Sequence, residues 1–169
     1  MKKHKIKRIV THLLKTRRDV LACFPKAAIE RVEQSIAISE TKHLAELRCV
    51  IESGWDILSL YREKSPRERA LEWFGQTRLW DTELNTGVLV YISFADQQIE
   101  IVADRGVVRL LPNSLWEKIC TGMSQSFKKQ EYTQALEAGL QAIEQELLRV
   151  LPRGELPYHN QHPNQVILI

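Results

Sequence analysis

The sequence predicts an α/β sandwich around a small mixed β-sheet. Helical and strand patterns follow one another in the order helix, strand, helix, strand, strand, helix, helix. The first two strands are joined through a helix, so we expect them to be parallel with a right-handed crossover. The second and third strands are separated by a tight turn and must be antiparallel. The length of 169 residues suits one such domain with short appended segments.

Composition supports a single core without cross-links. The chain is 44% hydrophobic and 27% charged, in the ordinary globular range. We expect a basic amphipathic helix at residues 1–23, an α/β domain at 24–151 and a tail at 152–169. Three cysteines without a CxxC pair predict free thiols in a reducing compartment, and hence a cytoplasmic protein. We recognise no signal peptide, and the longest apolar run is too short to span a bilayer.

The N-terminal segment is strongly cationic. Residues 1–26 hold nine basic residues and one acidic residue, a net charge of +8. Apolar residues recur there at three- and four-residue spacing, which predicts an amphipathic helix at residues 1–22 with the stripe Ile6, Ile9, Val10, Leu13 and Leu14. Such a helix can adsorb to an anionic membrane surface, or it can pack on the domain with its charged face in water. Nucleic acid is disfavoured because no aromatic residue precedes Phe24.

The first half of the domain reads helix, strand, helix. Proline followed by apolar residues at helical spacing predicts a helix at residues 25–38. Alternation at residues 44–51 predicts a strand that is covered well on one face only. Residues 55–64 have no clean period and read as a connection with a short helical turn. The run Ser65-Pro66-Arg67-Glu68 supplies an N-cap, a first-turn proline and a capping-box glutamate, so we expect the crossover helix to start there.

The second half reads strand, strand, helix, helix. Residues 87–94 are almost continuously apolar and predict a central strand, and residues 99–103 predict its hairpin partner. A capping box from Ser114 to Glu117 predicts the start of the next helix, and residues 131–150 predict the last one. The chain ends on four aliphatic residues, 166–169, which we expect to be docked rather than free.

The loop before the central strand is dense in oxygen ligands. If the hairpin turn is centred near Asp96 and Gln97, the register sets residue 104 opposite Leu89 and residue 106 near Gly87. The loop and the hairpin end would then meet where we expect the open crevice of the parallel pair, and the side chains that gather there are Asp81, Glu83, Asn85 and Asp104. Carboxylates and amides are ligands for Ca²⁺ or Mg²⁺, and Arg105 beside them could hold a phosphate oxygen. The same residue types also form ordinary turns, so a purely structural loop stays open.

Familiar catalytic signatures are missing. The chain has no GxxxxGK[ST], GxGxxG, HExxH or GxSxG motif, and no cysteine has an arginine six positions later. The five histidines are isolated and suit surface or capping roles. Residue chemistry therefore identifies no general acid, base or nucleophile.

Residues 24–151 resemble the TPM domain family, named after a thylakoid-lumen protein, a photosystem repair factor and a nematode receptor-associated protein. The resemblance is to a short bacterial branch and rests on Glu46, Arg48, the segments 69–74, 85–91 and 99–106, and the closing pattern from Trp116 to Leu147. It implies a three-layer α/β/α sandwich and roles in maintaining membrane complexes, with divalent-cation binding and acid-phosphatase activity in some members. Many members are exported and membrane-tethered, and this sequence shows neither feature.

Two functions follow from these observations. The first is a binding or accessory module for an unidentified protein or membrane-complex partner, in the cytoplasm or peripheral to the inner face of the membrane, with an optional Ca²⁺ or Mg²⁺ site. The second is a cation-dependent acid phosphatase, in which the metal polarises a phosphomonoester.

Overall fold

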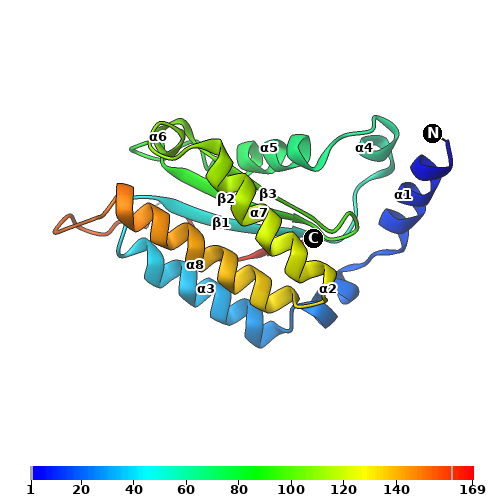
Figure 1. Cartoon of the computed structure of the whole chain (residues 1–169), viewed down its shortest axis with the longest axis horizontal. Coiled ribbons are helices and arrows are strands. Elements are labelled where there is room, and N and C mark those ends of the chain that lie inside the picture. The colour runs from blue at the N-terminus through cyan, green and yellow to red at the C-terminus, as the bar shows by residue number, and fades with distance from the viewer. Residues whose placement is uncertain (1, 161) are drawn as a thin grey trace.

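The computed structural model describes residues 2–160 and 162–169, except for the side chains of residues 2–4. It is the three-layer α/β/α sandwich that the sequence predicts (Figure 1). The helices are α1 (Lys2–Leu14), α2 (Arg17–Cys23), α3 (Lys26–Glu40), α4 (Ile57–Tyr61), α5 (Pro66–Gln76), α6 (Arg105–Val108), α7 (Asn113–Lys128) and α8 (Tyr132–Val150). The strands are β1 (Glu46–Glu52), β2 (Gly87–Ser93), β3 (Gln98–Ala103) and β4 (Ile167–Leu168).

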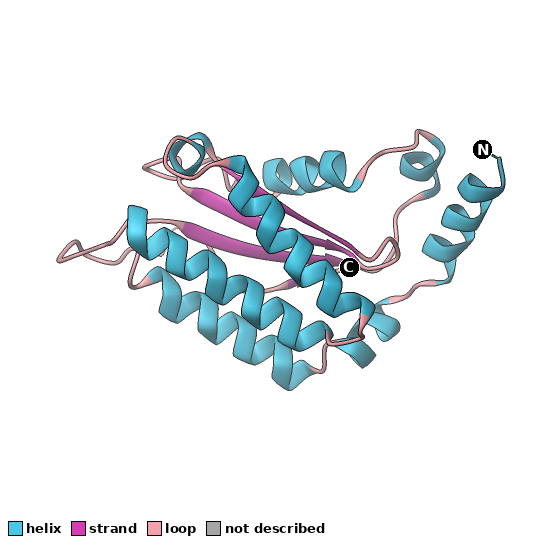
Figure 2. Cartoon of the chain, viewed as in Figure 1, coloured by secondary structure: helices cyan, strands magenta, loops and turns pink. Residues whose placement is uncertain are grey.

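The four strands form one mixed sheet between helices (Figure 2). Their order is β3-β2-β1-β4, with β1 parallel to β2 and to β4, and β2 antiparallel to β3. The crossover between β1 and β2 runs through α4 and α5. The predicted parallel pair and the predicted hairpin are therefore confirmed. The tail supplies the fourth strand, which the sequence analysis did not foresee.

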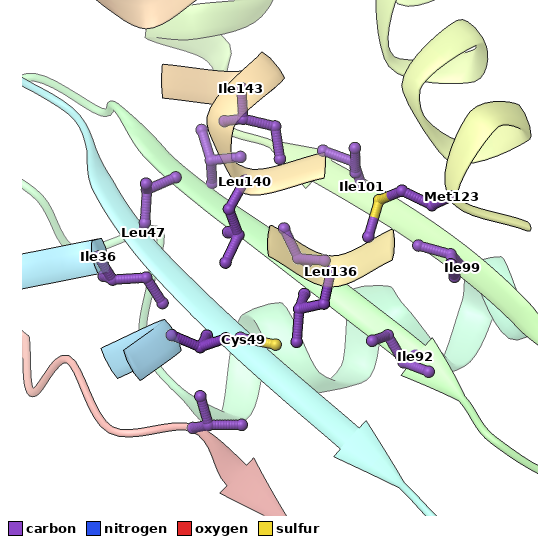
Figure 3. Close-up of a cluster of buried hydrophobic side chains, with 14 of the residues drawn as sticks. Ile36, Leu47, Cys49, Ile92, Ile99, Ile101, Met123, Leu136, Leu140 and Ile143 are labelled. Carbon is purple, nitrogen blue, oxygen red and sulfur yellow. The ribbon is translucent and has the colours of Figure 1, made fainter. Parts of the chain in front are cut away.

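The main core lies between the sheet and the layer of α3, α7 and α8. Inward-facing residues of β1, β2 and β3 meet those of the three helices there, among them Ile36, Leu47, Cys49, Ile92, Ile101, Met123, Leu136 and Ile143 (Figure 3). A smaller core under α5 joins Val50, Leu89 and Tyr91 to Ala70 and Leu79. All seven residues of β1 are buried, so the expectation that only one face of this strand is well covered is wrong. The crossover helix and the tail cover the second face.

Capping patterns in the sequence predict the start of α5 correctly and the start of α7 wrongly. At α5, Ser65 and Glu68 form the predicted capping box. At α7 the N-cap is Pro112 and the helix already includes Asn113, so the predicted box from Ser114 to Glu117 is wrong. Proline occupies this N-cap with extended backbone and without a side-chain cap.

The predicted N-terminal helix is interrupted. It divides into α1 and α2 at Thr16, where the Asp19 carboxylate accepts hydrogen bonds from the Thr16 N–H (2.7 Å) and hydroxyl (2.8 Å). The start of a second helix is thereby capped within a segment that looks periodic in sequence. Val20 of α2 and the following Phe24 lie in the main core. Met1 lies outside the described residues.

The C-terminal residues are docked on their own domain, as predicted. Strand β4 pairs with Val50 and Ile51 of β1. The Ile169 N–H donates to the Ile51 carbonyl (3.1 Å), and the Ser53 N–H donates to the Ile169 carbonyl (2.6 Å). The tail thus covers the edge of β1.

Candidate interaction surface

The predicted ligand loop lies at the amino ends of β1 and β2, opposite to where we expected the open crevice. The hairpin register differs from the expected one by two residues: Leu89 faces Val102, and the Asp104 N–H donates to the Gly87 carbonyl (2.8 Å). The reason is the reversing loop, which is centred between Ala95 and Asp96 because Ser93 pairs with Gln98. A shift of two residues keeps every side chain on its predicted face.

Three of the predicted site residues, Asn85, Asp104 and Arg105, contact one another at the amino end of β2. The Arg105 guanidinium donates to Asn85 Oδ1 from Nε (3.0 Å) and Nη2 (2.7 Å), and the Arg105 N–H donates to Asp104 Oδ1 (2.7 Å). Gly106 is required here, because a Cβ at this position would lie 2.5 Å from the Asn85 carbonyl oxygen. Arg105 therefore ties the loop to α6, while Asp104 caps that short helix.

The other two predicted ligands are exposed. Asp81 lies on the same loop, and Glu83 lines a cavity of about 310 Å³ together with Glu46, Arg153 and His159. Among the residues that the structure describes, no three His, Cys, Asp or Glu side chains are grouped so that they could hold a metal ion. The cation site stays a prediction.

Buried ionisable groups that the sequence analysis missed lie beside this cavity. The Leu47 N–H donates to Glu40 Oε1 (2.7 Å), and burial raises the pKa of the Glu40 carboxyl to about 8. Arg153 donates to the backbone carbonyls of Glu40 (2.8 Å) and His43 (2.7 Å), which fastens the tail to the end of α3. Burial also lowers the pKa of His43 to about 4, so this histidine is neutral and buried, and the surface role that the sequence left open beside a capping role is wrong.

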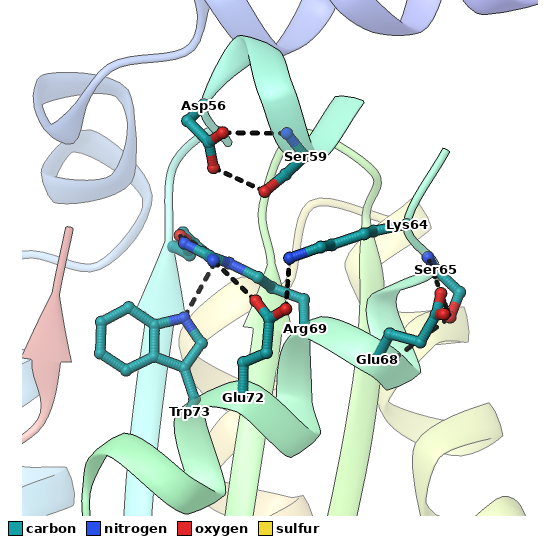
Figure 4. Close-up of polar contacts among 9 residues, drawn as sticks. Asp56, Ser59, Lys64, Ser65, Glu68, Arg69, Glu72 and Trp73 are labelled. Carbon is teal, nitrogen blue, oxygen red and sulfur yellow. Dashed lines mark hydrogen bonds and ion pairs between the residues drawn. The ribbon is translucent and has the colours of Figure 1, made fainter. Parts of the chain in front are cut away.

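The carboxyl ends of β1 and β2 are filled by a buried polar network. Glu52 accepts hydrogen bonds from Arg69 Nη2 (2.6 Å), Trp73 Nε1 (3.1 Å) and the Tyr91 hydroxyl (2.7 Å). Trp55 Nε1 in turn donates to the Tyr91 oxygen (2.9 Å). Figure 4 shows Arg69 and Trp73 on α5, beside the neighbouring capping box. Side chains that hydrogen-bond to one another thus occupy the carboxyl ends of the parallel strands, where an α/β fold usually binds its ligand.

Helix α1 is attached beside this network through its polar residues. Asp96, in the turn between β2 and β3, accepts two hydrogen bonds from Arg8 (2.9 and 3.0 Å) and one from His12 Nε2 (3.0 Å). The Trp55 N–H donates to His12 Nδ1 (3.1 Å), and a Cβ at Gly54 would lie 2.2 Å from the His12 carbonyl oxygen. Of the surface or capping roles expected for the histidines, the surface role is wrong for His12, which is buried. We call Asp96, Arg8 and His12 the Asp96 anchor.

Arg8 and His12 stabilise the ionised form of the Asp96 carboxyl. Burial by itself would raise the pKa of Asp96, but the hydrogen bonds from His12 and Arg8 hold it well below its usual range. The guanidinium of Arg8 also lies over the Trp55 ring, 4.6 Å from its centroid. The carboxylate thus stays ionised and holds α1 to the domain.

Four of the five residues of the predicted apolar stripe of α1 face away from the protein, and the fifth, Ile9, is partly buried. Ile6, Val10, Leu13 and Leu14 are 47% to 72% exposed, whereas the polar residues Arg8 and His12 contact the domain. We call these four residues the α1 face. A helix that packs on its domain normally buries the apolar side, so this orientation is the reverse of the usual one. Figure 1 shows α1 beside α4, apart from the layer of α3, α7 and α8.

Positive charge surrounds the α1 face. Lys7 on α1, Lys15 just after it, and Arg17 and Arg18 at the start of α2 are exposed. The neighbouring α4 adds the exposed side chains of Ile57, Leu58 and Tyr61, and Lys5 of α1 pairs with Glu63 just beyond it (2.8 Å). This end of the molecule therefore combines exposed apolar and cationic side chains.

Comparison with known proteins identifies the domain. The TPM domain family matches residues 18–146. The chain belongs to the TPM domain family. Among solved structures it is similar to the BA42 protein of the psychrophilic bacterium Bizionia argentinensis, with a TM-score of 0.72 and 20% identity over 83% of this chain and 92% of that one. At that identity the likeness shows the fold alone. No curated protein matches the chain.

Helix α1 precedes the part of the chain that matches the TPM domain. The match begins at residue 18, within α2, whereas the α1 face and two members of the Asp96 anchor lie before it. No described helix of this TPM protein is both long and apolar enough to cross a membrane. The sequence does carry one signal for the attachment of α1: Lys5, Arg8 and His12 recur at helical spacing and mark a polar stripe.

Proposed function

We propose that this TPM-domain protein is an accessory module that binds the surface of an anionic membrane through the α1 face. The observation that carries the proposal is the reversed orientation of α1: its polar residues Arg8 and His12 contact the domain, and the four aliphatic residues of the α1 face are exposed. An exposed stripe of large aliphatic residues is costly in water and is typical of a docking site.

Charge favours a lipid surface as the partner. The exposed basic residues Lys7, Lys15, Arg17 and Arg18 lie on and next to α1. Near an anionic membrane each Lys or Arg contributes about 1 kcal/mol, and apolar side chains gain further by entering the interface. The two contributions come from different residues of one short segment, the basic residues and the α1 face. Anionic lipids populate the cytoplasmic leaflet, so the proposal puts the protein at the inner face of the membrane.

The predicted Ca²⁺ or Mg²⁺ site is a secondary part of the proposal. Its support is that Asn85 and Asp104 lie at one edge of the sheet with Arg105 between them. The same contacts use Asn85 Oδ1 as an acceptor for Arg105. Nothing among the described residues favours the phosphomonoesterase reading, which rests on the family resemblance.

Co-sedimentation with vesicles tests the membrane proposal. The full chain is mixed with phosphatidylcholine vesicles, or with vesicles that also contain phosphatidylglycerol. We expect binding to the anionic vesicles at low salt, weaker binding as NaCl rises because the charges are screened, and little binding to the neutral vesicles. Absence of binding to anionic vesicles at low salt would contradict the proposal.

A further inference from the structure

We propose that Asp96 is a positioning residue that holds the α1 face outward, so that the protein carries a preformed docking helix rather than a basic tail that folds on contact. The inference rests on the proposed membrane function and adds a role for a residue of the β2–β3 turn.

The contacts of the Asp96 anchor all lie on one side of α1. Arg8 and His12 are four residues apart and therefore lie on the same helical face, and both donate to one carboxylate. Ser93 at the end of β2 also donates to Asp96 (3.1 Å), which ties the carboxylate to the sheet. The rotation of α1 about its axis is thus fixed by a rigid part of the domain.

Helix α1 needs such support. It has 13 residues, and an isolated helix of that length is only marginally stable in water. Without the Asp96 anchor, α1 would lose its helical order, or it would turn its apolar stripe toward the exposed apolar residues of α4, which include Ile57 and Tyr61. Either change removes the outward α1 face. A preformed helix spares the cost of ordering the segment during binding.

The substitution Asp96→Asn separates this role from simple charge. It removes one negative charge near a cationic surface, so a tail that acts by charge alone would bind anionic vesicles more tightly. The new amide would also place donor hydrogens against the donors of Arg8. If Asp96 positions the helix, binding becomes about tenfold weaker despite the favourable change in charge.

Glu63→Gln is the matched control. Among the described side chains of α1, Lys5 has the second acidic partner, Glu63, in an exposed pair. Substitution of Glu63 changes the net charge by the same amount while the Asp96 anchor stays intact. We expect this variant to bind anionic vesicles as tightly as the parent or more tightly. Two variants with the same change of charge would then differ in the sign of their effect.

Hydrogen exchange in the absence of vesicles completes the experiment. In Asp96→Asn the amides of α1 should exchange faster than in the parent while those of α8 stay protected; in Glu63→Gln both should be unchanged. If Asp96→Asn loses protection in α8 as well, Arg8→Lys replaces it, with Lys118→Arg, exposed on α7, as control. Both of these keep the charge, and only Arg8→Lys loses the two-bond contact with Asp96, so only it should bind more weakly.

The outcomes are distinct. Tighter or unchanged binding of Asp96→Asn, with the domain intact, overturns the positioning role and leaves the membrane proposal standing. A parent chain that does not bind vesicles overturns the membrane proposal. In that case hydrogen exchange still tests the positioning of α1, and protection of its amides in Asp96→Asn overturns it.

Discussion

Two carboxylates, those of the partly buried Asp96 and the buried Glu52, each organise several donors in this protein. Asp96 fixes α1, and Glu52 collects the donors of Arg69, Trp73 and Tyr91. Glu40 differs, because it has hydrogen bonds from Leu47 and Tyr158 but burial still favours its neutral form. A buried carboxylate without a strong cationic partner is the least stable kind, and it responds to pH.

Glu40→Gln should make the protein more stable at alkaline pH. The pKa of Glu40 is about 8 in the folded protein and 4.5 as the ordinary value. Between these values the folded state keeps a proton that the unfolded chain has released, so the free energy of unfolding falls as pH rises. Glutamine resembles the protonated acid and has no such dependence. Near pH 8 the variant should exceed the parent by up to about 4 kcal/mol, and near pH 5 the two should agree within about 1 kcal/mol.

Urea unfolding followed by tryptophan fluorescence at pH 5, 6, 7 and 8 measures the difference. The comparison of variant with parent cancels the opposite contribution of His43, which is common to both. A difference that does not grow with pH would show that Glu40 is ionised in the folded protein.

Calcium or magnesium titration tests the predicted cation site. A cation at a hundred times its dissociation constant stabilises the fold by about 2.7 kcal/mol, which raises the melting midpoint by roughly 5 to 10 °C for a domain of this size. The shift should be absent in Asp104→Asn, which keeps an acceptor for the Arg105 N–H and loses the charge. A parent midpoint that millimolar Ca²⁺ and Mg²⁺ leave unchanged would remove the cation site from the proposal.

Elements with a complete local signal are the ones that the sequence predicts well. The capping box at Ser65 and the continuous apolar run of β2 need only near neighbours, and both are found where expected. The interruption at Thr16 also has a local cause, but the apolar spacing on both sides hides it. The start of α7 shows that a serine followed three residues later by a glutamate is no cap when the helix begins earlier.

Alanine substitution at the two serines separates the true cap from the false one. In the parent, the Glu68 N–H donates to the Ser65 hydroxyl and the Ser65 N–H donates to the Glu68 carboxylate. Ser65→Ala should therefore lower the free energy of unfolding by about 1 kcal/mol. Ser114→Ala, inside the first turn of α7 and exposed, should have almost no effect or be slightly stabilising. Equal losses in a urea titration would argue that Ser114 does cap its helix.

Features of the whole molecule depend on residues far apart in the chain. His12 and Asp96 are 84 residues apart, and Arg153 reaches the end of α3 across 113. Periodicity shows that α1 has an apolar side and a polar side, but it cannot show which side contacts the domain when the partners, Asp96 and Trp55, lie far away in the chain. The candidate site was misplaced for a different reason: residues 81–86 precede β2 and lie at the amino ends of the parallel strands, whereas the open crevice of a parallel pair lies at the carboxyl ends.

The central claim is that the α1 face is the part of the molecule that binds the membrane. Val10 lies in this face. Val108, on α6 at the opposite end of the sheet, is a matched position. The two side chains are 47% and 53% exposed. Val10→Asp and Val108→Asp introduce the same side chain and the same change of charge. The most direct measurement is the dissociation constant of each variant for phosphatidylcholine vesicles that contain phosphatidylglycerol.

Val10→Asp should weaken binding about tenfold or more, because one aliphatic side chain no longer enters the interface and a negative charge faces the lipid. Val108→Asp should bind almost as the parent does. Equal weakening by the two substitutions would show that only net charge matters, and unchanged binding of Val10→Asp would contradict a docking role for the α1 face.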